Sequence, residues 1–212
     1  MLTSDLDTTR LAIIGPGRLG TAFAYKFGRD NKRVAIYYHD AEVCKTINRD
    51  HLNPLHLTED LAGRLGGMEN VPRLADKVYA TNDLEHIVEN NDFIILTITM
   101  NRLPEFLNYL KPMIDKKAGD TCLISPIKGL ISDEISKELI TPSQLINNSL
   151  YNLKHKYQIG CIGGPFFDMD IALGNPVCLT VAGRKRIANI IREELLKFNR
   201  KEINSYYNFD IV

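Results

Sequence analysis

The residues with the clearest chemical signal are three glycines near the start of the chain, in the pattern Gly15-x-Gly17-x-x-Gly20. They directly follow the apolar run 11–14, and a run compatible with a helix follows them. A buried strand, a glycine turn and a helix in this order can bind a dinucleotide pyrophosphate. The turn lets the phosphates approach the backbone, and the helix N-terminus attracts their charge. We therefore expect a dinucleotide site formed by Gly15, Pro16, Gly17, Arg18, Leu19 and Gly20.

The end of the next expected strand, 33–38, should face the ribose of such a dinucleotide. Tyr38, His39 and Asp40 stand at that end, and the sequence leaves open which of them contacts the ribose hydroxyls. The carboxylate of Asp40 would repel a 2′-phosphate, so the expected cofactor is NAD, with NADP as the alternative. Arg18 also has two interpretations, because its guanidinium can either reach a phosphate oxygen or face solvent.

Charge and cysteine usage narrow the class of protein. The 212 residues include 26 basic and 26 acidic side chains, and this balance does not favour nucleic acid or an anionic membrane as a partner. The chain has no apolar run of the roughly 20 residues that span a bilayer, and residues 1–10 are expected to be a polar tail rather than a signal peptide. No CxxC or HxxxH pair suggests a metal site. Cys122, Cys161 and Cys178 lie in apolar runs, so we expect buried free thiols and a cytoplasmic location.

Apolar runs alternate with helical patterns along the chain, which predicts an α/β fold. We expect a Rossmann-type, doubly wound, mostly parallel sheet in one domain over residues 11–212. Strands are expected over 11–14, 33–38, 77–80, 93–98, 121–125, 158–162, 177–181 and 203–207. Helices are expected over 18–28, 41–49, 83–89, 102–115, 133–140, 143–155, 166–173 and 185–199, and residues 50–76 should form a long excursion with one short helix.

Four further segments resemble the N-terminal domain of NAD(P)-dependent glycerol-3-phosphate dehydrogenases. They are Arg49–Asn53, Phe93–Met100, the Lys-Gly-Leu segment of Ile127–Leu130, and Gly163–Pro176, which is similar to the family's Ser-Gly-Pro-Ser-Phe-Ala-x-Glu motif. With the glycine turn, the resemblance covers essentially residues 10–212. It implies hydride transfer between a nicotinamide and C2 of glycerol 3-phosphate or dihydroxyacetone phosphate.

The resemblance also implies roles for individual residues. Lys128, just after an expected strand, would hold the substrate's phosphate or polarise its keto oxygen. Asn53 would bond either the cofactor or the backbone of a loop, and Phe166 and Phe167 would be either core residues or stacking partners of the nicotinamide. Cofactor contacts are expected from Thr97, Gly164, Pro165 and Phe166.

Several features depart from the family pattern. Its Val-Pro dipeptide is absent, with Thr99 and Met100 at that place, and Asp168 and Asp170 replace its Ala and Glu. The family's helical C-terminal domain, which carries a catalytic lysine, is not in this sequence. We therefore expect a cofactor-binding domain that is inactive alone and works with a helical-domain partner or as a homo-oligomer. The alternatives are a non-catalytic dinucleotide-binding or sensor protein, and a divergent relative that acts on another small substrate.

Overall fold

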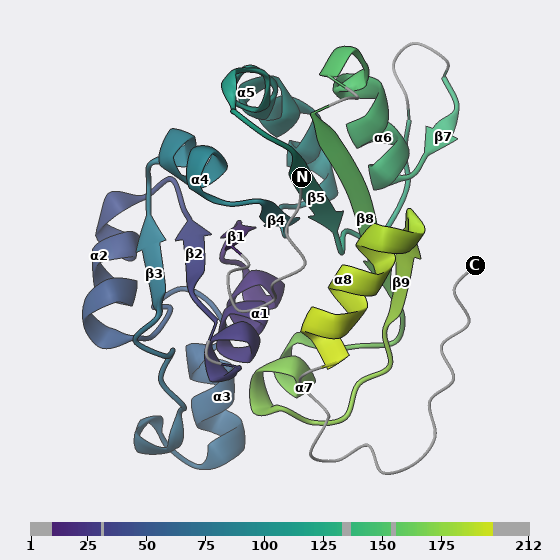
Figure 1. Cartoon of the computed structure of the whole chain (residues 1–212). Coiled ribbons are helices and arrows are strands. Elements are labelled where there is room, and N and C mark those ends of the chain that lie inside the picture. The colour runs from purple at the N-terminus through teal and green to yellow at the C-terminus, as the bar shows by residue number, and fades with distance from the viewer. Residues whose placement is uncertain (1–9, 31, 133–136, 154–155, 197–212) are drawn as a thin grey trace.

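A seven-stranded sheet forms the centre of the protein in the computed structural model, which describes residues 10–30, 32–132, 137–153 and 156–196 (Figure 1). The strand order is β3-β2-β1-β4-β5-β8-β9, and neighbouring strands are parallel except for β8 and β9. The order in which successive strands are added therefore reverses between β1 and β4, the place where ligands of doubly wound sheets bind. The strands are β1 (Leu11–Ile14), β2 (Val34–Tyr37), β3 (Val78–Thr81), β4 (Phe93–Leu96), β5 (Thr121–Ser125), β8 (Tyr157–Gly163) and β9 (Thr180–Gly183).

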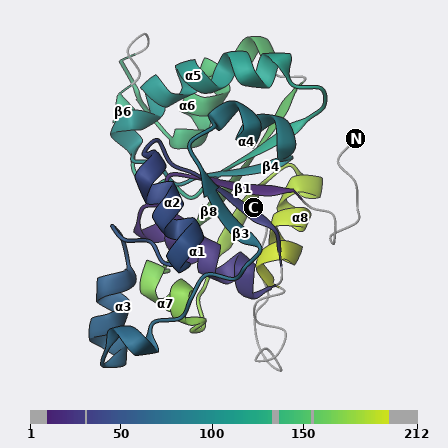
Figure 2. The same cartoon turned by 90° about the vertical axis from the view of Figure 1, so that its left-hand side faces the viewer.

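Helices cover both faces of this sheet, as Figure 2 shows. Leu11 and Ile13 of β1 belong to one apolar cluster, and Ala12 and Ile14 belong to the other, because successive strand residues point to opposite faces. On the first face lie α1 (Arg18–Arg29), α2 (Ala41–Asp50), α3 (Thr58–Leu65), α7 (Asp168–Leu173) and α8 (Lys185–Leu196). On the second lie α4 (Leu84–Asn90), α5 (Leu103–Lys116) and α6 (Pro142–Ser149).

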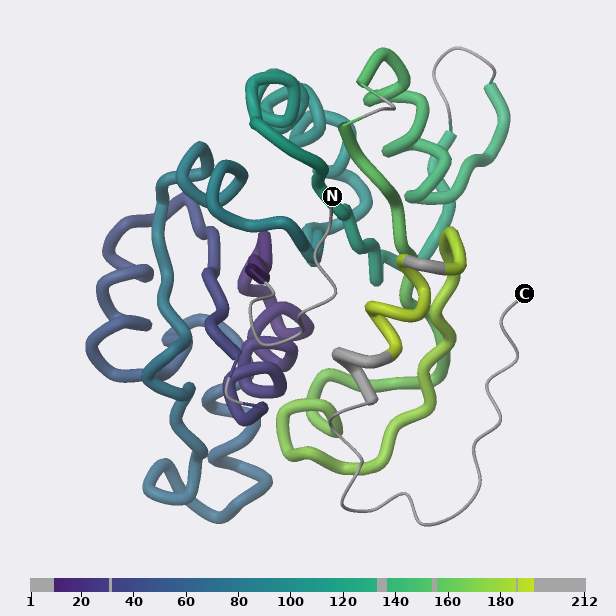
Figure 3. The backbone as a smooth tube through the Cα atoms, in the orientation of Figure 1, coloured from purple at the N-terminus to yellow at the C-terminus, as the bar shows by residue number. Residues whose placement is uncertain are grey.

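Short 3-10 turns in the described residues are η2 (Met68–Asn70), η3 (Met100–Arg102) and η4 (Tyr151–Leu153). Figure 3 shows α1, from the beginning of the chain, side by side with the later α7 segment. None of the described helices has the length and apolar character needed to cross a membrane. The predicted Rossmann-type, mostly parallel sheet is confirmed.

The helix expected over 133–140 is wrong in the part that the structure describes. Residues 139–140 form β7 (Leu139–Ile140), which pairs antiparallel with β6 (Ile131–Ser132), while 133–136 lie outside the described residues. The next helix, predicted separately over 143–155, forms as α6. Thr141 caps α6, with its hydroxyl accepting from the N–H of Gln144 at 3.3 Å, and the proline after it favours an extended Thr141.

Other boundaries shift by a few residues. The strand expected over 177–181 begins only at Thr180, which leaves Cys178 exposed rather than buried as predicted. The helix expected over 166–173 begins at Asp168, and the one over 143–155 ends at Ser149, before η4. The strand expected over 203–207 lies outside the described residues.

Candidate functional site

The glycine turn between β1 and α1 is closed by contacts that admit no side chain. A Cβ at Gly20 would lie 2.2 Å from the Gly15 carbonyl oxygen and 2.6 Å from Thr97 Oγ1, so α1 packs against the turn only because residue 20 is glycine. Gly15 itself has a φ of +95°, which favours glycine. These positions explain two of the three glycines in the motif as requirements of the turn.

Gly17 has a different reason to be glycine. It is the N-cap of α1 in an extended conformation, and it brings no side chain to cap the first N–H groups of the helix. A Cβ built there meets no heavy atom within 4 Å. Packing within the protein therefore does not require glycine at this position, and the space beside the helix N-terminus is open to a ligand.

Buried uncharged hydrogen bonds hold the turn in place. Thr97 Oγ1 lies 2.6 Å from the Gly15 carbonyl oxygen, to which it can donate. Asn53 is 1% exposed and its amide donates to the Pro16 carbonyl oxygen and to Thr21 Oγ1, each at 2.7 Å. Of the two roles predicted for Asn53, the structure places it on the loop backbone. Thr21, whose hydroxyl also bonds Pro16, was not singled out by the sequence.

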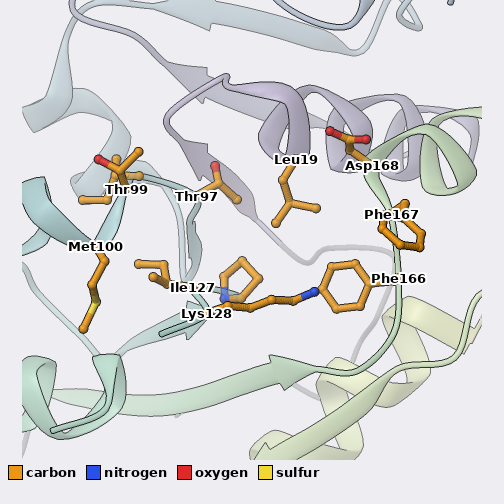
Figure 4. Close-up of a pocket in the computed structure, with 11 residues that line it drawn as sticks. Leu19, Thr97, Thr99, Met100, Ile127, Lys128, Phe166, Phe167 and Asp168 are labelled. Carbon is orange, nitrogen blue, oxygen red and sulfur yellow. The ribbon is translucent and has the colours of Figure 1, made fainter. Parts of the chain in front are cut away.

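Two cavities lie beside the turn and share the segment 97–99. The larger, of about 850 Å³, adjoins Gly15, Pro16 and Gly17 and extends toward the end of β2. The smaller, of about 440 Å³, lies between Leu19 and the loop that follows β5 (Figure 4). Together they offer one elongated site, with the open position at Gly17 beside its larger part.

The end of β2 separates the three candidates for a ribose contact. Tyr38 and His39 line the larger cavity, with their rings 4.5 Å apart between centroids. Asp40 is not among the residues that line this cavity. Its carboxylate instead caps α2, where it accepts from the N–H groups of Glu42 at 2.9 Å and Val43 at 3.2 Å.

The sequence did not single out several other residues that line the larger cavity. Arg102, Phe106 and Tyr109 come from η3 and α5, and His56 comes from the loop before α3. The first three follow the strand β4, whose carboxyl end faces the site, and that position is the one signal in the sequence that could have indicated them.

The smaller cavity brings together Lys128 and Phe166 from two different loops. The Lys128 ammonium lies 4.5 Å from the centroid of the Phe166 ring, as Figure 4 shows. Gly164 and Pro165 do not line the cavity and instead form the turn that carries Phe166 into it. Most of the remaining lining is apolar: Leu19, Ile98, Met100, Pro126, Ile127 and Phe167.

Arg18 is about half exposed to solvent, as one of its two interpretations expects, and it also forms ion pairs that neither interpretation included. Its Nε donates to Asp168 Oδ2 at 2.6 Å, and another guanidinium N–H donates to Asp60. The hydrogen bond with Asp168 raises the pKa of Arg18. The side chain therefore ties α1 to α7 and α3. Asp170 bonds Asn175 and lies away from the cavities.

Among the residues that the structure describes, no three His, Cys, Asp or Glu side chains gather where they could bind a metal ion. The site therefore has an open space at a helix N-terminus, a cavity with aromatic lining on one side and a lysine on the other. Such a site can bind an elongated anionic ligand and place one end of it next to a positive charge.

Comparison with known proteins identifies a family whose description names NAD, an elongated anionic ligand of the kind that this site could bind. The sequence model of the family described as "NAD-dependent glycerol-3-phosphate dehydrogenase N-terminus" matches residues 10–189. A curated glycerol-3-phosphate dehydrogenase [NAD(P)+] of Xanthomonas campestris pv. campestris (strain B100) is 25% identical over 179 residues, covering 83% of this chain and 45% of the relative. The chain thus spans about half the length of the curated relatives that it matches.

Solved structures show the same fold. Glycerol-3-phosphate dehydrogenase from Coxiella burnetii has a TM-score of 0.70 and 19% identity, with 88% of this chain and 51% of that chain covered. The Dunaliella salina structure has a TM-score of 0.72 and 18% identity, with 96% and 33% covered. At these identities the likeness concerns the fold alone.

Proposed function

The chain belongs to the family of NAD-dependent glycerol-3-phosphate dehydrogenase N-terminal domains. From this premise we propose which part of a nicotinamide dinucleotide each of its two cavities binds. The glycine turn holds the pyrophosphate of NAD(H) or NADP(H). The larger cavity takes the adenosine half, beside Tyr38 and His39, and the smaller cavity takes the nicotinamide half, beside Lys128.

The observation that carries this proposal is the open space at Gly17. Gly15 and Gly20 are explained by the turn itself, but nothing within 4 Å requires glycine at position 17. A bound pyrophosphate does require it, because a side chain there would occupy the space of the phosphate oxygens. The adjoining N–H groups of α1 and the positive end of its dipole then stabilise the phosphate charge.

We further propose that the domain serves hydride transfer between a nicotinamide and C2 of a small phosphorylated substrate, glycerol 3-phosphate or dihydroxyacetone phosphate. The bound cofactor would supply the redox chemistry. Lys128 would hold the substrate's phosphate or polarise its keto oxygen by its charge. The remaining groups would come from a helical domain or from a second copy of the chain, in the cytoplasm.

Titration of NADH and NADPH into the 212-residue chain, with Gly17→Val as the variant, tests the proposal. The wild type should bind with an affinity of about −4 to −8 kcal/mol, that is, in the millimolar to micromolar range. Gly17→Val should weaken binding about a hundredfold or more, at an unchanged unfolding midpoint. Gly63→Val is the matched control, because Gly63 in α3 also has no heavy atom within 4 Å of its Cβ position. Equal affinities in wild type and Gly17→Val would overturn the proposal.

The lining of the smaller cavity favours a second candidate. Phe166 stands where the family motif has Ser, so an apolar ring replaces a hydroxyl in this cavity, and Thr99 and Met100 replace the family's Val-Pro. A non-catalytic dinucleotide binder, or an enzyme for another small substrate, fits such a lining. Oxidation of NADH with dihydroxyacetone phosphate, measured with and without a helical-domain partner, separates these candidates from the main proposal.

A further inference from the structure

The side chain of Lys128 rests on the face of the Phe166 ring, and this contact departs from the family motif, which has Ser at the position of Phe166. The distance of 4.5 Å from the ammonium to the ring centroid lies within the range of a cation–π interaction. Figure 4 shows the lysine side chain extended along the smaller cavity, with its nitrogen at the ring.

The topology of the sheet brings the two residues together. β5 and β8 are parallel neighbours, with Ser125 paired to Cys161, so the loops that follow them leave the same edge of the sheet. Lys128 lies in the first loop and Phe166 in the second. Their meeting depends on two strands far apart in sequence.

The ring is the fixed partner in this contact. Phe166 is 5% exposed and belongs to the apolar cluster on the α1 face of the sheet. Gly164, two residues before it, has a φ of +118° and a Cβ position 2.8 Å from the Cys178 carbonyl oxygen, so the turn accepts only glycine. Asp168, two residues after it, is held by Arg18. The long stem of Lys128 is therefore the part that has to be positioned.

The contact holds the ammonium without neutralising it. Within the described parts of the chain, no carboxylate lies within the 4.0 Å of an ion pair with Lys128. A carboxylate partner would compete with an anionic ligand for the ammonium, whereas an aromatic face attracts the cation and leaves its charge in place.

We propose that Phe166 is a positioning residue, whose ring holds the Lys128 ammonium at the smaller cavity with its charge available to an anionic or carbonyl oxygen. This inference rests on the proposed role of Lys128 in binding substrate. Phe166 would then position Lys128 through an aromatic ring, and the Ser of the family motif has no such ring.

The full 212-residue chain with 4-fluoro-, 3,5-difluoro- or pentafluorophenylalanine at position 166 tests this inference. Fluorine withdraws electron density from the ring face and changes its shape little, so a purely structural role of the ring would not produce a graded response. Two quantities are measured: the rate of Lys128 acetylation, by mass spectrometry, and the dissociation constant for inorganic phosphate. Unfolding midpoints show that each variant folds.

Acetylation should accelerate stepwise along the series, because a weaker ring shields the amine less, and phosphate should bind more weakly in the same order. The total change should lie between about twofold and about thirtyfold, the range of one cation–π contact. The same substitutions at Phe93, which is also 5% exposed, should change neither quantity.

Lys128→Met separates the inference from the function on which it rests. Phosphate binding that does not depend on Lys128 would contradict the proposed role of the lysine. Phosphate binding that depends on Lys128 but stays flat along the fluorinated series, with a flat acetylation rate, would overturn the role of Phe166 alone.

Discussion

The glycine turn and the segment Gly164–Asp168 border the same site, but different forces hold them. The turn is fixed by close backbone packing at Gly20 and by the buried, uncharged bonds of Asn53. The segment also has close packing, at Gly164 and at the buried Phe166 ring that meets Lys128, but it adds a charged contact. Its last residue, Asp168, forms an ion pair with Arg18, and these two side chains are 21% and 45% exposed.

This difference matches what the proposed function requires each region to bind. A pyrophosphate is the same in every nicotinamide dinucleotide, so a rigid backbone with no adjustable side chain would suit it. In the proposed function the other end of the site would meet the group that varies between substrates, and there the charge of Lys128 would contribute to what binds. The turn should therefore respond to packing changes and be insensitive to salt, whereas the segment should respond to charge and to salt.

The largest effect should come from Gly20→Ala. The added methyl carbon would lie 2.2 Å from the Gly15 carbonyl oxygen, which is backbone and cannot turn aside. We expect a loss of about 3 kcal/mol or more in the free energy of unfolding, together with loss of NADH binding. Urea unfolding measures the first quantity and calorimetry the second. Gly17→Ala is the control, with a stability loss within about 1 kcal/mol; a similar small loss for Gly20→Ala would show that the turn is not rigid.

Asn53→Ala should produce the next largest effect. It removes two donated hydrogen bonds from a side chain that is 1% exposed and leaves the Pro16 carbonyl oxygen without that partner. We expect a loss of about 2–3 kcal/mol in unfolding free energy, the same in low and high salt. Asn70→Ala removes an exposed bond to the Leu65 carbonyl and should cost much less. A loss that shrinks in high salt would contradict the uncharged character assigned to the turn.

Substitutions of Asp40 test whether the proposed adenosine end of the site, like the glycine turn, binds without the help of a charged side chain. Because its carboxylate caps α2, Asp40→Ala should cost about 1 kcal/mol of stability, and Asp40→Asn should cost less because asparagine also caps helices. The ratio of NADH to NADPH affinity, measured by competition titration, should change by less than about twofold in Asp40→Asn. A tenfold gain in NADPH affinity would instead return Asp40 to the role of ribose contact.

The glycine turn and the contacts around it also differ in how far the sequence alone could predict them. The glycine turn follows from a strand, three glycines and a helix within ten residues, so local spacing was sufficient to predict it. Asn53 bonds a residue 37 positions away, and the sequence therefore left its role open between two partners. Arg18 bonds Asp168 across 150 positions, and neither interpretation of Arg18 included that pair.

Local patterns also misled just before α6. The pattern of polar and apolar residues before Thr141 predicts a helix, but Leu139–Ile140 pair with Ile131–Ser132 as a short antiparallel ladder. In the larger cavity, Phe106 and Tyr109 read as ordinary positions of a helix. Phe106 reaches the site beside Tyr37 at the end of β2, with their ring centroids 6.5 Å apart, and local spacing does not predict a contact between such distant residues.

The smallest effect should come from the link between the two regions, the pair of Arg18 and Asp168. Arg18 is about half exposed, so its ion pairs are partly screened by water, and Arg18→Met should cost no more than about 1 kcal/mol of unfolding free energy. Loss of the guanidinium also leaves Asp60 and Asp168 without the cation that they share. That like-charge repulsion is electrostatic, so the loss should be largest at low ionic strength and nearly vanish at about 1 M salt, where screening acts within about 3 Å.

The double variant Arg18→Glu, Asp168→Arg exchanges the charges of this pair, but it places a carboxylate at position 18 opposite Asp60. It should therefore recover only part of the stability that each single reversal loses, and NADH affinity should follow the same order. Arg49→Met, which removes an exposed pair with Asp50 on α2, should leave NADH affinity unchanged. If Arg18→Met lost the same unfolding free energy at low and at high salt, the contact between Arg18 and Asp168 would act through packing, like the contacts of the glycine turn. The ion pair between α1 and α7 would then contribute through shape rather than through charge.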